Sequence, residues 1–136
     1  MIIMGVDLGH ARTGIAVCDK REILASPVKV ITAYTNEKVA AEVTALAKEL
    51  RAEKIVVGLP KNMDGSEGES AQNARAFAAM LQESTGLPVV MQDERGTTVT
   101  AHGYLNETNV RGKKRKQTVD AVAAVIILQN YLDSTR

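Results

Sequence analysis

The sequence of 136 residues has one cysteine, two histidines and no Cys/His cluster. The lone Cys18 cannot form an internal disulfide, and its place in an apolar, strand-like run suits a reducing compartment. The N-terminus lacks a basic region followed by a long apolar core, and no apolar run is long enough to cross a bilayer. We therefore expect a cytoplasmic protein with no membrane partner. The missing Cys/His cluster argues against a zinc site.

Aromatic residues are also scarce, with three Tyr, one Phe and no Trp. This number is too small for a base-stacking platform of the kind that binds single strands. The sequence contains no internal repeat, linker or low-complexity segment, and 45% of its residues are hydrophobic and 24% charged. Such a composition is typical of globular proteins. We predict a single domain over residues 1–136, long enough to bury its own core.

The net charge of +1 conceals an asymmetry along the chain. Residues 1–94 carry 10 Lys and Arg against 13 Asp and Glu, whereas residues 95–136 carry 7 against 3. The basic excess is concentrated in one run, which contains Arg111, Lys113, Lys114, Arg115 and Lys116. Such a run suits a loop that binds phosphates, although an exposed, solvated loop has the same composition.

The order of the expected elements predicts an α/β fold. Three strand-like runs come first, at Ile2–Gly9, Gly14–Asp19 and Glu22–Ile31. Pro27 in the third run predicts an edge strand or a bulge. A helix is expected next, from Glu37 to about Arg51, capped by Thr35 or Asn36. It is followed by a strand at Lys54–Gly58 and a loop at 59–69. A second helix, capped by Ser66 or Ser70 and ending at Gly86, then leads to a strand at Pro88–Met91.

Two further helices are expected after the fifth strand. One is capped by Thr97 or Thr98 and runs to about Asn106, and the last runs from Val119 to about Leu132 after a basic loop that ends at Thr118. The whole pattern predicts a five-stranded mixed sheet, with three antiparallel strands followed by two parallel ones. Helices should cover both faces of this sheet.

Acidic residues stand at the ends of the predicted parallel strands. Asp7 ends the first strand, and Asp93 and Glu94 follow the fifth. Because such strand ends share one edge of a sheet, these side chains are expected to converge. A fourth acid, Asp120, is the single charge in the apolar start of the last helix. Buried carboxylates require a cation, since desolvating an isolated one is very costly.

Each acid also has a simpler explanation. Asp7 can close an Asx-type turn before the second strand. Asp93 and Glu94 can form an ordinary ion pair with Arg95. Asp120 can be a first-turn carboxylate favoured by the helix dipole. Taken together, however, the acids form a hard, oxygen-rich site that suits Mg²⁺ or Mn²⁺, and two such ions can clamp the attacking water and the leaving oxygen of a phosphodiester.

Four motifs occur in order along nearly the whole chain: Asp7–Gly14, Val57–Asn62 with Gly65 and Ser66, Asp93–Arg95 followed by Thr97 and Thr98, and Lys113–Lys116 leading into Asp120–Ala124. Together they resemble the YqgF family of Holliday-junction-resolvase-like proteins in the ribonuclease H-like superfamily. Members of that family are named as nucleases of pre-16S ribosomal RNA. The resemblance agrees with the strand order predicted above.

The resemblance implies that Asp7, Glu94 and Asp120 are the catalytic acids and that they bind the metal, with Asp93 competing with Glu94 for one ligand position. It also implies that Arg12, Lys61 and Arg95 lie near the scissile phosphate. The basic run would contact backbone phosphates without reading bases.

The leading hypothesis is therefore a metal-dependent nuclease of structured nucleic acid that processes the 5′ end of pre-16S rRNA in ribosome biogenesis. One alternative is a Holliday junction resolvase that acts on branched DNA. Another is a non-catalytic nucleic-acid-binding module in ribosome maturation or transcription. An ATPase of the actin or sugar-kinase type fits poorly, because it needs two domains of this fold. The expected partners are pre-rRNA or branched DNA and a ribosomal particle, and both a monomer and a homodimer remain open.

Overall fold

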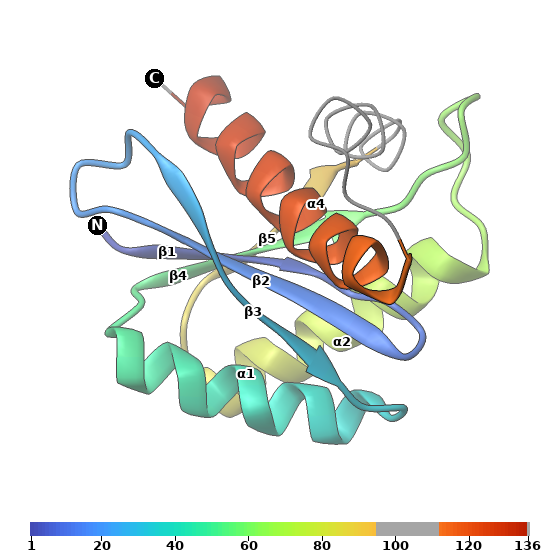
Figure 1. Cartoon of the computed structure of the whole chain (residues 1–136), viewed down its shortest axis with the longest axis horizontal. Coiled ribbons are helices and arrows are strands. Elements are labelled where there is room, and N and C mark those ends of the chain that lie inside the picture. The colour runs from blue at the N-terminus through green and yellow to red at the C-terminus, as the bar shows by residue number, and fades with distance from the viewer. Residues whose placement is uncertain (95–111, 136) are drawn as a thin grey trace.

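The computed structural model describes residues 1–94 and 112–135, with side chains from residue 121 onward in the second segment (Figure 1). Its elements are β1 (Ile3–Asp7), β2 (Arg12–Cys18), β3 (Ala25–Thr32), α1 (Asn36–Leu50), β4 (Lys54–Leu59), α2 (Glu69–Thr85), β5 (Val89–Asp93) and α4 (Gly112–Ser134). The helix predicted at Thr97–Asn106 lies outside the described residues. None of the described helices is long and apolar enough to span a membrane.

The strands form one five-stranded sheet in the order β3-β2-β1-β4-β5. β2 pairs antiparallel with β1 and β3, whereas β4 pairs parallel with β1 and β5. This confirms the predicted mixed sheet. The three parallel strands end at Asp7, Leu59 and Asp93, so their carboxyl ends lie along one edge of the sheet.

Strand β3 lies at the edge of the sheet, as its proline predicts. Pro27 is paired with Ala16, and the register between β2 and β3 shifts between Ile15 and Ala16. Proline has no N–H to donate to a ladder, and an edge strand with an irregularity accommodates that loss. Both features predicted for Pro27 are therefore present.

Helices cover both faces of the sheet (Figure 1). On one face, α1 and α2 pack on the buried side chains of Met4 and Val6 through residues such as Val43, Phe77 and Leu81. On the other face, α4 packs on the core around Ile3, Ala16 and Val56, where it contributes Ala124, Ile127, Leu128 and Leu132. Side chains alternate between faces along a strand, so Ile3, Gly5 and Asp7 of β1 all point toward the α4 side.

At Gly5, α4 packs closely against β1. A Cβ at this position would lie 2.8 Å from Leu128 Cβ and 3.1 Å from the Ala124 carbonyl oxygen. We expect Gly5→Ala to push the helix off the sheet and lower the free energy of unfolding by about 1–3 kcal/mol. Urea unfolding measures this loss. An unchanged or higher free energy of unfolding would show that α4 shifts at no cost.

Helix α4 begins earlier than the sequence predicted. The expected loop over the basic run and the expected cap at Thr118 are wrong, because the helix already includes residues 112–118. Lys and Arg are good helix formers, and their propensity decides the conformation here. The first turn of α4 contains no acidic residue. Asp120 is thus too far along the helix to be the first-turn carboxylate of the simpler explanation.

The N-termini of α1 and α2 are capped differently. Thr35 caps α1 as predicted, accepting a hydrogen bond from the Lys38 N–H at 3.3 Å. The predicted serine cap of α2 is wrong, since its N-cap is Gly68 and makes no side-chain cap hydrogen bond. Ser66 is engaged elsewhere, as its Oγ donates to Asp64 Oδ1 at 2.6 Å.

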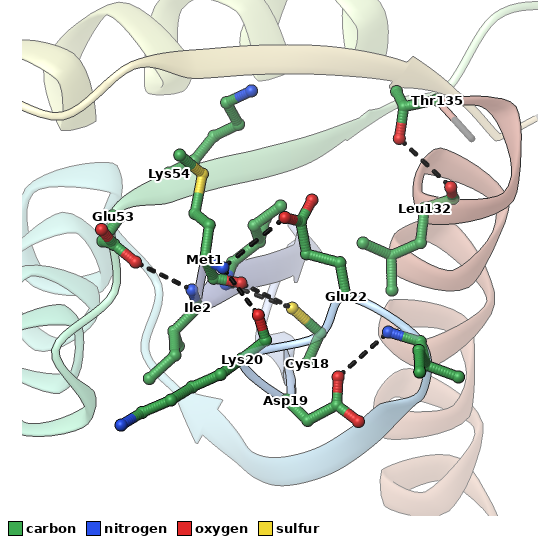
Figure 2. A network of polar contacts seen from close by, with 12 residues as sticks. Met1, Ile2, Cys18, Asp19, Lys20, Glu22, Glu53, Lys54, Leu132 and Thr135 are labelled. Carbon is green, nitrogen blue, oxygen red and sulfur yellow. Dashed lines mark hydrogen bonds and ion pairs between the residues drawn. The ribbon is translucent and has the colours of Figure 1, made fainter.

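Polar contacts hold the start of β1, at the end of this strand opposite to Asp7 (Figure 2). The Met1 ammonium group donates to the Lys20 carbonyl oxygen at 2.8 Å, and the Ile2 N–H donates to Glu53 Oε2 at 3.1 Å. The buried Cys18 accepts a hydrogen bond from the Ile3 N–H at 3.3 Å. Burial raises the pKa of the Cys18 thiol.

Candidate active site at the carboxyl edge of the sheet

Asp7 is the last residue of β1, the central strand of the sheet. It is paired with Gly14 of β2 and is partly buried. The alternation described above directs its side chain to the α4 side of the sheet. An apolar strand therefore presents a carboxylate at the parallel edge, as the sequence predicted.

Glu94 follows β5 directly and is held over the end of β4. Its N–H donates to the Leu59 carbonyl oxygen at 3.1 Å. Its carboxyl group occupies the space above Gly58, where a Cβ would lie 2.5 Å from Glu94 Oε2 and 2.6 Å from Ile127 Cδ1. Only a residue without a side chain leaves this space, so Gly58 is part of the site.

The carboxyl groups of Glu94 and Asp7 interact directly. Burial, together with the negative charge of Asp7, a hydrogen bond to Asp7 and the charge of Asp93, raises the pKa of Glu94 to about 9. Glu94 is therefore protonated at neutral pH and donates a hydrogen bond to the Asp7 carboxylate. The described residues bring Asp7 and Glu94 together, while Asp93 acts on Glu94 through its charge.

The carboxyl oxygens of Asp7 and Glu94 are suitable ligands for a hard divalent cation. Carboxylate oxygens are the ligands preferred by Mg²⁺ and Mn²⁺, and a cation beside Asp7 would favour the ionised form of Glu94. Among residues 1–94 and 121–135, no group of three or more His, Cys, Asp and Glu side chains could hold a metal ion.

The raised pKa of Glu94 predicts how stability depends on pH. In the unfolded chain Glu94 loses its proton near its ordinary value of 4.5, but in the folded protein it does so near 9. The folded state binds more protons between these values, so stability falls as the pH rises through this window. In chelator, we expect Glu94→Gln to gain about 1–3 kcal/mol over wild type between pH 5 and pH 8, after allowing for relaxation and water entry.

Urea unfolding at the two pH values measures this difference. Glu42→Gln, an exposed change on α1, serves as the control and should leave the pH dependence as in wild type. Parallel pH profiles for wild type and Glu94→Gln would contradict the assignment of the buried proton to Glu94.

Two of the predicted phosphate-contacting residues lie at this edge. Arg12 is the first residue of β2, reached through a tight turn in which any Cβ on Gly9 would collide with the Arg12 carbonyl oxygen. Lys61 follows the end of β4 by two residues, and its N–H donates to the Leu59 carbonyl oxygen at 2.9 Å. Both backbones are thus close to the strand ends that carry the acids.

The other predicted site residues lie after β5. Arg95 and Arg111 lie outside the described residues. Lys113–Lys116 and Asp120 lie on the first turns of α4, and their side chains are outside the described part.

The connection between β4 and α2 is a hydrogen-bonded turn. The Asn62 N–H donates to the Ser66 carbonyl oxygen at 2.8 Å, and Asn62 Nδ2 donates to Ser66 Oγ at 2.9 Å. The turn is tied to α2 by Arg75, whose Nε and Nη2 donate to the Glu67 carboxylate at 2.7 and 2.9 Å. These contacts fix the segment that follows Gly58 and carries Lys61.

Sequence reasoning identified Gly58 as a strand end and as part of the motif Val57–Asn62, and missed its contact with Glu94. A signal was present, because glycine inside a β-branched run often marks a close approach by another group. Which group approaches becomes evident only in the fold, because Glu94 is 36 residues away in the sequence.

Comparison with known proteins finds similar sequences that cover nearly the whole chain. Two relatives are named "Putative pre-16S rRNA nuclease". The one from Rhodopirellula baltica is 45% identical over 134 residues, covering 98% of this chain and 78% of the relative. The one from Listeria monocytogenes serotype 4b is 44% identical over 137 residues, covering 99% of both chains.

The fold is also found in a solved structure. Thermus thermophilus RuvC, in complex with its Holliday junction substrate, matches with a TM-score of 0.62 and 15% identity, covering 99% of this chain and 95% of that chain. This likeness confirms the ribonuclease H-like fold. A family model described as "RuvX: Holliday junction resolvase" matches residues 1–134. The chain therefore belongs to the RuvX family, which is the YqgF-like family indicated by its motifs.

Proposed function

We propose that this protein is a divalent-metal-dependent nuclease that processes the 5′ end of pre-16S rRNA during ribosome biogenesis. Membership of a family described by its resolvase activity and the names of relatives at 44–45% identity support hydrolysis of phosphodiester bonds. The observation that carries the proposal is the pair of Asp7 and Glu94, two carboxyl groups held in contact at the edge where the parallel strands end.

The third acid is proposed to be Asp120. In a helix, residues four and seven apart share a face, so position 120 belongs to the same stripe as Ala124 and Ile127. Ala124 lies against Gly5, and Ile127 lies beside Glu94 at Gly58. The C-terminal part of α4 packs at the start of β1, so its N-terminal part extends toward Asp7. This placement supports Asp120 as a third metal ligand beside Asp7 and Glu94.

Mg²⁺ or Mn²⁺ at these acids would supply a nucleophilic water at neutral pH and would stabilise charge on the phosphate in the transition state. Asp7, on the central strand, is proposed to contact the metal throughout the reaction. Glu94 must lose its proton to act as a ligand, which Asp7 and Asp93 disfavour until positive charge is present. Of the two adjacent acids, the direct contact with Asp7 supports Glu94 over Asp93 as the ligand.

The cations are proposed to hold the nucleic acid. Arg12 and Lys61 are positioned at the strand ends, and Lys113–Lys116 occupy the first turns of the helix that carries Asp120. Arg95 and Arg111 are expected to add to this basic surface. Contacts of this kind follow the backbone and release counterions, so binding should weaken steeply as salt rises.

The test is cleavage of precursor 16S rRNA by the purified protein. With Mg²⁺ or Mn²⁺, the 5′ end should be trimmed, and chelator should stop the reaction. A four-way DNA junction of matched length is the second substrate, because the family description favours branched DNA as the alternative. Preferential cutting of the junction would replace the RNA proposal. Tight binding without cutting of either substrate, in metal and chelator alike, would indicate a non-catalytic module.

A further inference from the structure

A pocket of about 620 Å³ opens beside the end of β1 that carries Asp7, at the edge of the sheet where the parallel strands end. Leu8, Gly9 and His10, which follow Asp7 directly, form one wall, and Pro60 lies beyond the end of β4. The remaining lining residues come from the segment that leads into α1 and from the first turns of α2. Leu8 packs with the α1 and α2 core, so the pocket and the Asp7 carboxylate lie on the two sides of one strand end.

The lining of the pocket is polar but carries little charge. Its side chains include the imidazole of His10, the phenol of Tyr34, the hydroxyl of Ser70 and the carboxamides of Asn36, Gln72 and Asn73. None of the ten described lining residues is Lys or Arg, and Glu69 adds a carboxylate. The Glu69 carboxylate would repel a phosphate, and no Lys or Arg among these residues offsets that repulsion, so an uncharged group with donors and acceptors fits better.

Tyr34 supplies an aromatic face at this pocket. Tyr34 is 74% exposed, so its ring is accessible to a ligand. An exposed ring at the rim of a pocket can stack on a planar group, and every nucleobase has a face suited to this contact. One such ring serves a single base, which agrees with a sequence too poor in aromatics for a stacking platform.

Asn36 at the start of α1 and Asn73 of α2 are linked by a hydrogen bond between their side chains. Asn36 Nδ2 donates to Asn73 Oδ1 at 3.0 Å. This bond uses one donor of Asn36 and one acceptor of Asn73, so the pair retains a carbonyl acceptor and amide donors. A matched acceptor and donor is what the edge of a nucleobase requires, and a volume of this size is ordinary for a small-ligand site.

We propose that this pocket receives one unpaired base of the nucleic acid, next to the phosphate that Asp7 and Glu94 address. This inference rests on the proposed nuclease function and deepens it. The substrate would be a strand with an unstacked nucleotide beside the cleaved bond, with Tyr34 stacking on its base. Asn36, Gln72 and Asn73 would bind its edge.

The first experiment follows the isotope-labelled full chain by NMR during titration with uridine or adenosine, in chelator so that cleavage plays no part. Signals of Leu8–His10 and of the Asn36, Gln72 and Asn73 side-chain amides should shift at millimolar nucleoside. Inorganic phosphate and ribose are the control ligands. Equal shifts with phosphate, or none with either nucleoside, would overturn the proposal.

The second experiment measures binding of a short single-stranded RNA to variants in chelator. Tyr34→Ala should weaken binding by about 5–100-fold, the range of one lost base–aromatic stack. Tyr34→Phe should restore it, and Leu24→Ala, an exposed apolar change at the turn before β3, should have no effect. Unaltered binding by Tyr34→Ala would overturn the pocket even if the protein cuts pre-rRNA. Nucleoside binding without any cleavage would support the proposed base-binding pocket and contradict the proposed nuclease function.

Discussion

Asp7→Asn is expected to lower cleavage of the RNA substrate by about 1,000-fold or more, while the protein stays folded. The change keeps the size of the side chain but removes the charge from the acid on the central strand. Metal ions at such sites contribute several kcal/mol of transition-state stabilisation, and each 1.36 kcal/mol is a factor of ten in rate. Single-turnover cleavage measures the loss, and the affinity for Mn²⁺ should fall with it.

The matched control is Asp19→Asn. Asp19 is an exposed carboxylate in the turn between β2 and β3, where its Oδ1 accepts from the Ile23 N–H at 3.0 Å, a bond that the Asn oxygen can retain. This variant should cleave as wild type does. Asp120→Asn should resemble Asp7→Asn. Equal cleavage by all of these variants would mean that the site is misassigned or that another nuclease contaminates the preparation.

Gly58→Ala is expected to lower cleavage by about 10–100-fold, although it replaces no charged residue. The added Cβ would meet Glu94 Oε2 on one side and Ile127 Cδ1 on the other. A displacement of about 1 Å at a reacting group can cost 100-fold in rate. The same crowding should also reduce the free energy of unfolding by about 1–3 kcal/mol.

A second change separates the two effects of Gly58→Ala. Valine lacks the Cδ1 atom, so Gly58→Ala with Ile127→Val should recover part of the stability but not the cleavage rate. Gly86→Ala is the control for strain alone, because φ is +69° there and a Cβ would meet nothing within 4 Å. That variant should lose stability and cleave normally. Full activity of Gly58→Ala would show that Glu94 does not depend on the space above β4.

Much of the sheet was predictable because the residue composition of each strand matches its burial in the fold. The strand that ends in Asp7 is a short apolar run with one charge, and β4 is a β-branched run of the kind found in covered strands. Once the two are parallel neighbours, the edge position of Asp7 follows from geometry alone. The edge position of β3 was predictable for a different reason, since Pro27 cannot occupy a central ladder.

The choice between Asp93 and Glu94 could not be made from the sequence. The two are adjacent and chemically alike, and only the fold decides which one lies over Gly58 in contact with Asp7. The start of α4 was mispredicted because two tendencies compete in Lys113–Lys116. A run of like charges suggests a solvated loop, whereas the intrinsic propensity of Lys and Arg favours a helix.

Tyr34 shows a third kind of gap between sequence and structure. The ring occurs in a polar connection and carries no motif, so nothing local distinguishes it from a surface tyrosine. Its environment is assembled from the ends of β1 and β4 and the starts of two helices. A pocket of this kind is a property of the topology, and short-range patterns do not report it.

The burial of Cys18 gives this protein an intrinsic reporter of its own opening. Cys18 is 5% exposed, its sulfur accepts a hydrogen bond from the N–H of Ile3 and its pKa is raised, so a thiol reagent reaches it only when the core that it shares with Ile3 and α4 opens. When opening and closing are fast relative to alkylation, the rate of alkylation follows the population of opened molecules. Asp120 lies on the same helix. The rate of Cys18 alkylation, measured with and without Mg²⁺, therefore tests whether a metal near the N-terminal part of α4 lowers the frequency of opening at Cys18.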